Sequence, residues 1–255
     1  MALAWRASVP GLAFGCGFVN NGIFKSNETG FGPALSLPSQ LKVGNFSHCF
    51  TDITGSEPST VLLVLPANLY SNAGGVVQST LLIQSSSSLN AYCLSLKGIT
   101  VGSTRLFVSE RVLSLPQGQI PESVFTPKED WTRGTVIDSG TGMTSLPQNA
   151  YDILYDAFVA QVGFPVLNSS ASSVTHSASL RHCRGSPSVR RWTWPGRIIC
   201  LGFEDAGAGG NFTCLAVNAG DDMTIIGSYQ QQNMHVLYDL VSNKLSFVPA
   251  RCNMF

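Results

Sequence analysis

Residues 135–141, with the sequence Thr-Val-Ile-Asp-Ser-Gly-Thr, constrain the fold more than any other stretch of the chain. Val136 and Ile137 favour an extended, buried strand, and Gly140 permits a sharp turn directly after it. An aspartate at the end of a buried strand, such as Asp138, is costly unless hydrogen-bond donors lie close to it. The residues on either side of the glycine carry hydroxyl groups, which can be those donors. Taken alone, the segment more often forms an ordinary Asx turn that closes a hairpin, because Asp, Ser, Gly and Thr are common turn residues.

A second segment changes this interpretation. Residues 224–227, Thr-Ile-Ile-Gly, place two apolar residues and a glycine after a β-prone residue. The pairing of hydrophobic-Asp-Ser-Gly-Thr with a later hydrophobic-hydrophobic-Gly resembles the ψ-loop of the pepsin-like aspartic proteases. Further segments resemble the plant nepenthesin-like branch of that family, in its order: 14–17 (Phe-Gly-Cys-Gly), 35–41 (Leu-Ser-Leu-Pro-Ser-Gln-Leu), 45–49 (Asn-Phe-Ser-His-Cys), 92–99 (Tyr-Cys-Leu-Ser-Leu-Lys-Gly-Ile) and 226–233 (Ile-Gly-Ser-Tyr-Gln-Gln-Gln-Asn).

The resemblance implies a mainly β chain with the pepsin-like aspartic protease fold, N-terminally truncated and with a few short helices. Residues 1–87 are expected to be a remnant of the N-terminal peptidase lobe, and residues 88–255 to form the C-terminal lobe. The serine run at 85–88 has the composition of a linker between the two. The family carries a further hydrophobic-hydrophobic-Gly element near residues 31–34, which is absent here, so the first ψ-loop is expected to be incomplete.

Local patterns predict several elements. Residues 36–41 read as a short helix with Pro38 in its first turn. Strand signals occur at 46–50, 61–65, 235–239 and 244–248, the last two as a hairpin. A longer helix is predicted by apolar residues at helical spacing that pack under a sheet: Tyr151, Leu154, Phe158 and Val162. Ser145 and Gln148 form a capping-box pattern at its start.

The resemblance also assigns roles at the site. It implies that Asp138 is the second of two catalytic aspartates, which share one proton and activate a water molecule between them. It implies that the substrate-binding and supporting residues are Ser139, Gly140, Thr141, Met143, Thr144, Ile226 and Gly227. The expected substrate is a protein or peptide cleaved at acid pH, with no metal and no cofactor.

The sequence contains Asp-Ser/Thr-Gly once, at Asp138. Because the reaction needs two carboxylates, we expect an aspartic endopeptidase that is present as a fragment and is inactive as written. The alternative is a non-catalytic binding protein that resembles the plant xylanase inhibitors, although the intact Asp-Ser-Gly-Thr favours the protease. A third interpretation, a non-functional gene product, follows from the altered segments at 31–34 and 181–197.

Residues 181–197 gather five arginines and two tryptophans in a chain with 12% charged residues. A nucleic-acid surface is disfavoured, because the basic segment is confined and the formal net charge is zero. Codons compatible with residues 192–201, read in the neighbouring frame, encode Asp-Leu-Ala-Arg-Glu-Asn-Tyr-Leu-Phe, which resembles the family sequence at this place. We therefore hypothesise a local frameshift in this segment.

The seven cysteines are dispersed without a C-x-x-C pair, and the four histidines have no metal spacing, so we expect no metal site. The resemblance implies a disulfide between Cys49 and Cys252. It leaves the partner of Cys214 open between Cys183 and Cys200.

Four glycosylation sequons support a secretory origin, at Asn27, Asn45, Asn168 and Asn211. The family resemblance implies an extracellular or vacuolar protein, although residues 1–6 lack the layout of a signal peptide. No apolar run is long enough to span a bilayer. We expect a monomer with no nucleic-acid or membrane partner.

Overall fold

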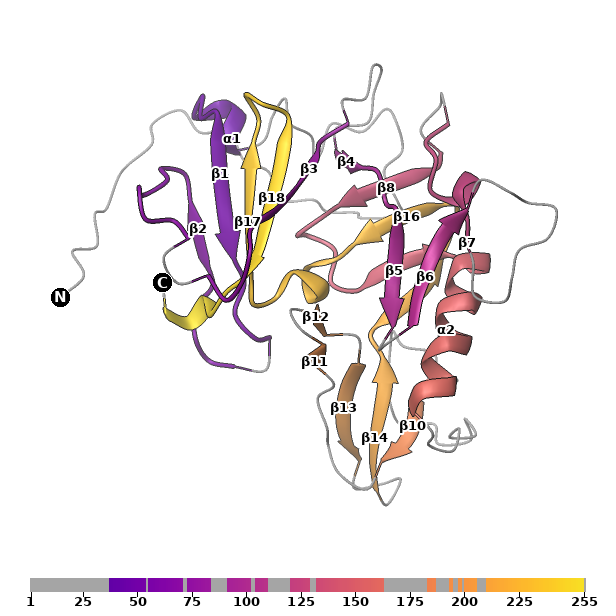
Figure 1. The fold of residues 1–255 in the computed structure, drawn as a ribbon. Coiled ribbons are helices and arrows are strands. Elements are labelled where there is room, and N and C mark those ends of the chain that lie inside the picture. Colours follow the sequence, from indigo (N-terminus) through magenta and orange to yellow (C-terminus); the bar gives the residue numbers. More distant parts are fainter. Residues whose placement is uncertain are drawn as a thin grey trace, which may run out of the picture.

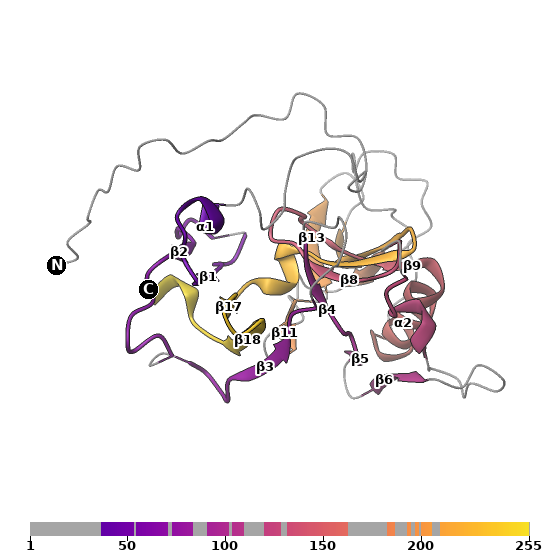
Figure 2. The same ribbon diagram turned by 90° about the horizontal axis from the view of Figure 1, so that it is seen from above.

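The computed structural model contains two five-stranded sheets that lie side by side, with the long helix α2 (Gln148–Val162) on the outer side of one of them (Figure 1). The view from above separates the two sheets in the same way (Figure 2). The described residues are 37–53, 55–70, 73–83, 91–101, 104–109, 120–128, 132–162, 183–186, 193–194, 197–198, 200–205 and 210–254. The chain is therefore mainly β, as the sequence predicts.

The antiparallel sheet joins strands from distant parts of the sequence, in the order β2-β1-β17-β18-β3. Its strands are β2 (Thr60–Leu62), β1 (Asn45–Cys49), β17 (Met234–Asp239), β18 (Lys244–Pro249) and β3 (Gln78–Leu81). The predicted strand at 46–50 and the predicted C-terminal hairpin are confirmed. The strand predicted at 61–65 is wrong in its second half, because the chain bends after Leu62.

The hairpin turn between β17 and β18 follows from its polar residues. Asp239 Oδ1 accepts hydrogen bonds from the backbone N–H groups of Val241, at 3.2 Å, and Ser242, at 3.0 Å. Asn243 has a φ of 50°, a left-handed conformation that asparagine tolerates better than most residues. The turn fixes Asp239 opposite Lys244 and thereby sets the register of the whole hairpin.

The mixed sheet has the order β15-β9-β16-β8-β4. Its strands are β15 (Val217–Gly220), β9 (Thr144–Pro147), β16 (Met223–Ile226), β8 (Gly134–Ile137) and β4 (Tyr92–Leu94). All four residues of β8 are buried, as its β-branched sequence predicts. β16 pairs with β8 in parallel, and it separates β8 from β9, although β8 and β9 follow one another in the sequence.

Apolar and aromatic side chains join the two sheets. The rings of Phe46 and Tyr238, on adjacent strands of the antiparallel sheet, stack with centroids 4.5 Å apart. The ring centroid of Tyr92, from the mixed sheet, lies 4.8 Å from that of Tyr238. One buried cluster contains residues from both sheets: Leu82, Leu94, Ile137, Met234, Val236, Tyr238 and Leu245. The end of β8 is therefore packed directly against the antiparallel sheet.

The helix α2 covers the mixed sheet with the predicted apolar stripe. Tyr151, Leu154 and Phe158 are each 2% exposed and pack with Leu146 of β9 in one core cluster. The predicted capping box is wrong, because Ser145 lies inside β9 and pairs with Asn218 of β15. The parallel pairing keeps the chain extended through Pro147, so the helix begins only at Gln148.

The smaller elements lie around these two sheets. The short helix predicted at 36–41 is confirmed as α1 (Leu37–Gln40). Short 3₁₀ helices occur at η1 (Glu122–Val124), η3 (Ser228–Gln231) and η4 (Cys252–Met254). The remaining strands are β5 (Gly98–Val101), β6 (Thr104–Ser109), β7 (Ile120–Pro121), β10 (Cys183–Ser186), β11 (Thr193–Trp194), β12 (Arg197–Ile198), β13 (Cys200–Asp205) and β14 (Gly210–Leu215). The serine run at 85–88, and with it the expected lobe boundary, lies outside the described residues, as does the segment at 31–34. None of the described helices is long and apolar enough to cross a membrane.

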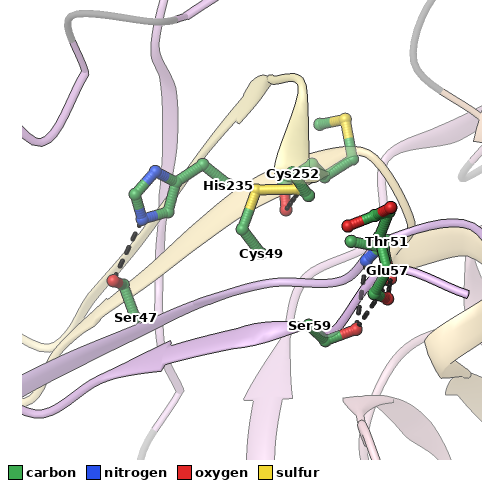
Figure 3. The surroundings of a disulfide bond; sticks show 8 residues. Ser47, Cys49, Thr51, Glu57, Ser59, His235 and Cys252 are labelled. Carbon is green, nitrogen blue, oxygen red and sulfur yellow. Dashed lines mark hydrogen bonds between the residues drawn. A yellow bond between two sulfur atoms is a disulfide. The ribbon is translucent and has the colours of Figure 1, made fainter. Parts of the chain in front are cut away.

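A disulfide closes the antiparallel sheet at one end (Figure 3). It joins Cys49, the last residue of β1, to Cys252 in η4, across a sequence separation of 203 residues. This is the pairing that the family resemblance implies. Beside it, His235 Nε2 and the buried Ser47 hydroxyl are 3.0 Å apart, which shows that this face of the sheet contains hydrogen-bonded polar groups.

Candidate active site

Asp138 and Gly227 lie side by side, because β8 and β16 run in parallel and end at the same level. Ile137 is opposite Ile226 in the register, and the N–H of the next residue, Asp138, donates a 3.0 Å hydrogen bond to the Ile226 carbonyl. The loop from Asp138 leads over the end of β16 into β9. A strand inserted between two sequence-adjacent strands in this way is the ψ arrangement that the sequence predicts.

The Asp138 carboxylate is held by its own turn. Oδ1 accepts a hydrogen bond of 2.8 Å from the Gly140 N–H, and Oδ2 accepts one of 2.6 Å from the Thr141 hydroxyl. Both are charge-assisted bonds, which are stronger than bonds between neutral groups. Asp138 is half-buried while Ser139 is exposed, so an ionisable oxygen pair is fixed in place directly after the end of β8.

Gly227 permits close contact between the two turns. A Cβ atom at Gly227 would lie 2.6 Å from the Gly142 carbonyl oxygen and 2.7 Å from the Met143 carbonyl carbon, distances that no side chain tolerates. The contact allows the Ser228 N–H to donate to the Thr141 carbonyl at 2.7 Å. The hydrophobic-hydrophobic-Gly pattern is therefore a packing requirement of the Asp138 loop.

Thr144 and Met143 differ in their surroundings. Thr144 is buried, and its hydroxyl oxygen accepts the Gly227 N–H at 3.0 Å. Met143 is half-buried, and its sulfur accepts a 3.7 Å hydrogen bond from the Asn218 side-chain amide. The buried Thr144 therefore joins the end of the Asp138 loop to Gly227, whereas Met143 is more exposed.

Two residues near Asp138, Tyr238 and Gln230, carry no signal in the local sequence. Burial raises the pKa of the Tyr238 hydroxyl, and the neighbouring Tyr92 and the Asp138 charge raise this pKa further. Gln230 accepts hydrogen bonds from the Thr144 N–H and hydroxyl, at 3.2 Å and 2.5 Å. Their partners are distant in the sequence, so reasoning from the sequence did not find them, although Gln230 lies in a segment that resembles the family.

The structure brings the predicted residues around Asp138 into one place. They are the three residues that follow it, with Met143, Thr144, Ile226 and Gly227. Within the described ranges, no group of three or more His, Cys, Asp or Glu side chains is arranged to hold a metal ion. The arrangement presents one supported carboxylate on a ψ-shaped loop.

Known proteins resemble this chain in sequence and in fold. The family model described as Xylanase inhibitor C-terminal matches residues 91–249, which include the whole Asp138 loop and β16. Two aspartic proteinases of Nepenthes gracilis, nepenthesin-2 and nepenthesin-1, are 37% and 35% identical over 262 and 255 residues. The chain belongs to the nepenthesin-like branch of the pepsin-like aspartic proteases. Each nepenthesin alignment covers 96% of this nepenthesin-like chain and 55% of the relative, so the chain spans about half the length of these relatives.

Solved structures with little sequence identity have the same pepsin-like fold as this nepenthesin-like chain. The crystal structure of edgp is 16% identical, with a TM-score of 0.59, and the match covers 87% of this chain and 59% of that one. The crystal structure of the basic 7S globulin from soybean is 17% identical, with a TM-score of 0.53, and the match covers 87% of this chain and 58% of that one. At these identities the likeness concerns the fold alone.

Proposed function

We propose that this chain contributes one of the two catalytic aspartates, Asp138, to an aspartic endopeptidase that cleaves proteins or peptides at acid pH. The observation that carries the proposal is the carboxylate itself, which is fixed by the Gly140 N–H and the Thr141 hydroxyl on the ψ-loop. The names of the nepenthesin relatives support it. Ser139, Met143 and the supporting residues described above complete this half of the proposed site.

In the proposed reaction two carboxylates share one proton, because two like charges so close cannot both ionise. One carboxylate accepts a proton from a water molecule as that water attacks the scissile carbonyl, and the other donates a hydrogen bond to the carbonyl oxygen. The pair titrates as a unit, which favours an acid optimum. The fixed geometry of Asp138 would hold its oxygens ready for either role.

The experiment compares two preparations in a pepstatin-sensitive assay at acid pH. Chain 1–255, with its single Asp-Ser-Gly, is expected to be inactive, and the protein isolated from its natural source is expected to cleave a denatured protein substrate. Asp138→Asn in an active preparation should abolish cleavage, whereas Asp156→Asn, on the helix α2, should not. An active Asp138→Asn variant would contradict the proposal.

A second candidate is a non-catalytic binding protein, which the description of the matching family model, Xylanase inhibitor C-terminal, favours. Under this proposal the chain binds a secreted enzyme such as a xylanase and does not cleave it. Inhibition of xylanase activity by the purified chain, without proteolysis and without change in Asp138→Asn, would support this candidate over the protease. The intact support of Asp138 argues for the protease, since a binder does not need it.

We further propose a secretory location, either extracellular or vacuolar. The Cys49–Cys252 disulfide supports it, because such bonds persist in oxidising compartments. Asn45, the acceptor of one sequon, is exposed on β1. A mass increase at Asn45 that is removed by a glycosidase would support this location.

A further inference from the structure

Gln230 connects three strand ends that meet beside the Asp138 loop. Its Oε1 atom accepts hydrogen bonds from the N–H and the hydroxyl of Thr144, where β9 begins. Its Nε2 atom donates a 2.8 Å hydrogen bond to the carbonyl of Ala216, directly before β15. Gln230 itself lies in η3, which follows Gly227 at the end of β16. One side-chain amide thus holds the ends of three strands of the mixed sheet.

The direction of each hydrogen bond is fixed. The Gly227 N–H donates to the Thr144 hydroxyl oxygen at 3.0 Å, so the hydroxyl hydrogen must point to another acceptor. The Gln230 carbonyl supplies that acceptor, at 2.5 Å. The Ala216 carbonyl can only accept, so it requires the NH₂ end of the amide and fixes its orientation. The result is a relay of donors from Gly227 through Thr144 to Gln230 and Ala216.

This relay anchors the far end of the loop that carries the carboxylate. The loop begins at Asp138, whose N–H is bonded to the Ile226 carbonyl, and it ends at Thr144, which is bonded to Gln230. Between these points the η3 backbone donates to the loop, from Tyr229 N–H to the Gly142 carbonyl at 3.0 Å. Without Gln230, the buried hydroxyl of Thr144 would lose its acceptor, and a buried polar group without a partner is costly.

The neighbouring glutamines do different work. Gln231 Nε2 donates to the Ile226 carbonyl at 3.0 Å, and Gln232 Oε1 accepts the Ile53 N–H at 3.1 Å. Gln232 is buried, lies two residues from Gln230, and its side-chain oxygen bonds to Ile53, which lies outside the Asp138 loop. It is therefore a matched control for the same substitution.

We propose that Gln230 is a positioning residue for the Asp138 carboxylate, acting through Thr144 and Gly227. The inference deepens the proposed function and rests on it as far as catalysis is concerned. Its structural part, that Gln230 holds the Asp138 loop, stands on the hydrogen bonds alone.

The first experiment measures amide hydrogen exchange in chain 1–255 and needs no activity. In Gln230→Met the Gly140 and Gly227 N–H groups should exchange about tenfold faster than in Gln232→Met, when the two variants are compared at equal free energy of unfolding. Equal exchange at these two glycines in both variants would overturn the proposal, because Gln230 would then contribute only general stability.

A second variant separates the two ends of the amide. Gln230→Glu keeps an acceptor for Thr144 but, when ionised, has no donor for the Ala216 carbonyl. As the pH falls and the new carboxyl becomes protonated, the donor returns. The exchange of Gly140 and Gly227 in Gln230→Glu should therefore approach that of the unsubstituted chain at low pH, and a difference that is independent of pH would count against the relay.

A third measurement uses the natural protein. Gln230→Met should lower kcat about tenfold with KM within about twofold, since a misplaced carboxylate affects the reaction more than binding. An unchanged kcat would overturn the catalytic part. If the unsubstituted protein itself does not cleave, the proposed function fails, while the exchange experiment still decides the role of Gln230 in the loop.

Discussion

The Thr141 hydroxyl lies 2.6 Å from Asp138 Oδ2, three residues along the same turn, and donates a hydrogen bond to it. The bond joins a residue at the end of β8 to the turn that leads over β16. Support for the carboxylate therefore comes from the segment that carries it.

Replacement of Thr141 tests this support. Thr141→Val removes the donor and should lower kcat/KM of the natural protein about ten- to a hundredfold, the range for the loss of one charge-assisted hydrogen bond. Thr141→Ser keeps the hydroxyl and should retain most of the activity. Steady-state kinetics on both variants provide the measurement, and equal losses in the two would show that the hydroxyl is not the important group.

Gly227→Ala should destabilise the fold by about 3 kcal/mol, because overpacking of a tight contact has a cost of this order. The added Cβ would lie 2.6 Å from the Gly142 carbonyl oxygen. Gly227 has a φ of −77°, which any residue adopts, so the effect is steric. Gly142→Ala, where nothing lies within 4 Å of the added atom, should change the free energy of unfolding by less than about 0.5 kcal/mol. Urea unfolding of the pair measures the difference.

His48 should make the fold less stable in acid. Burial lowers the pKa of its imidazole from 6.5 to about 4, and its ring stacks on Phe50 with centroids 4.1 Å apart. The folded state therefore prefers the neutral ring. Its contribution to stability is complete above pH 6.5 and is lost as the pH falls from there to about 4, by about 3 kcal/mol in total.

The variant His48→Phe keeps an aromatic ring that cannot titrate. The free energy of unfolding of the unsubstituted chain, relative to this variant, should fall between pH 7 and pH 4. The charge of His235, whose own pKa is lowered by burial, also lowers the pKa of His48, so the difference contains the coupling of the two imidazoles. A difference that stays constant over this range would show that His48 takes up its proton as easily in the folded state as in the unfolded one.

Loss of the Cys49–Cys252 disulfide should lower the free energy of unfolding by about 5 kcal/mol, the chain-entropy value for a loop of this length. The double variant Cys49→Ala/Cys252→Ala tests this by chemical denaturation. It avoids a reducing agent, which would act on the other cysteines as well. A loss below about 1 kcal/mol would mean that the unfolded chain gains little freedom from removal of the bond.

The backbone register favours one partner for Cys214. Cys183 is directly opposite it in the β10–β14 pair, whereas Cys200 is opposite Leu215. Directly opposed residues on antiparallel strands are near enough for a disulfide. We predict that peptide mapping without reduction recovers a Cys183–Cys214 peptide, and recovery of Cys200–Cys214 in its place would contradict the prediction.

Elements set by local residues were predictable from the sequence. The Asp138 turn, the β17–β18 hairpin and the stripe of α2 each depend on neighbours a few positions away. The capping box at Ser145 was predicted wrongly, because pairing with β15, some 70 residues further on, keeps that segment extended. Gln230 was not identified as a site residue for the same reason, since its partner Thr144 is 86 residues away. The family resemblance supplied the pairing of Asp138 with Gly227, which local propensity does not contain.

The position of β17 at the centre of the antiparallel sheet affects how the chain folds during its synthesis on the ribosome. β1 and β2 are synthesised before β17, and β1 can complete its pairing only when residues 234–239 have emerged. Contacts over such sequence distances form slowly. Until then β1 exposes an unpaired edge to other chains. We therefore expect the nascent chain to need protection by a chaperone until residues 234–239 have emerged.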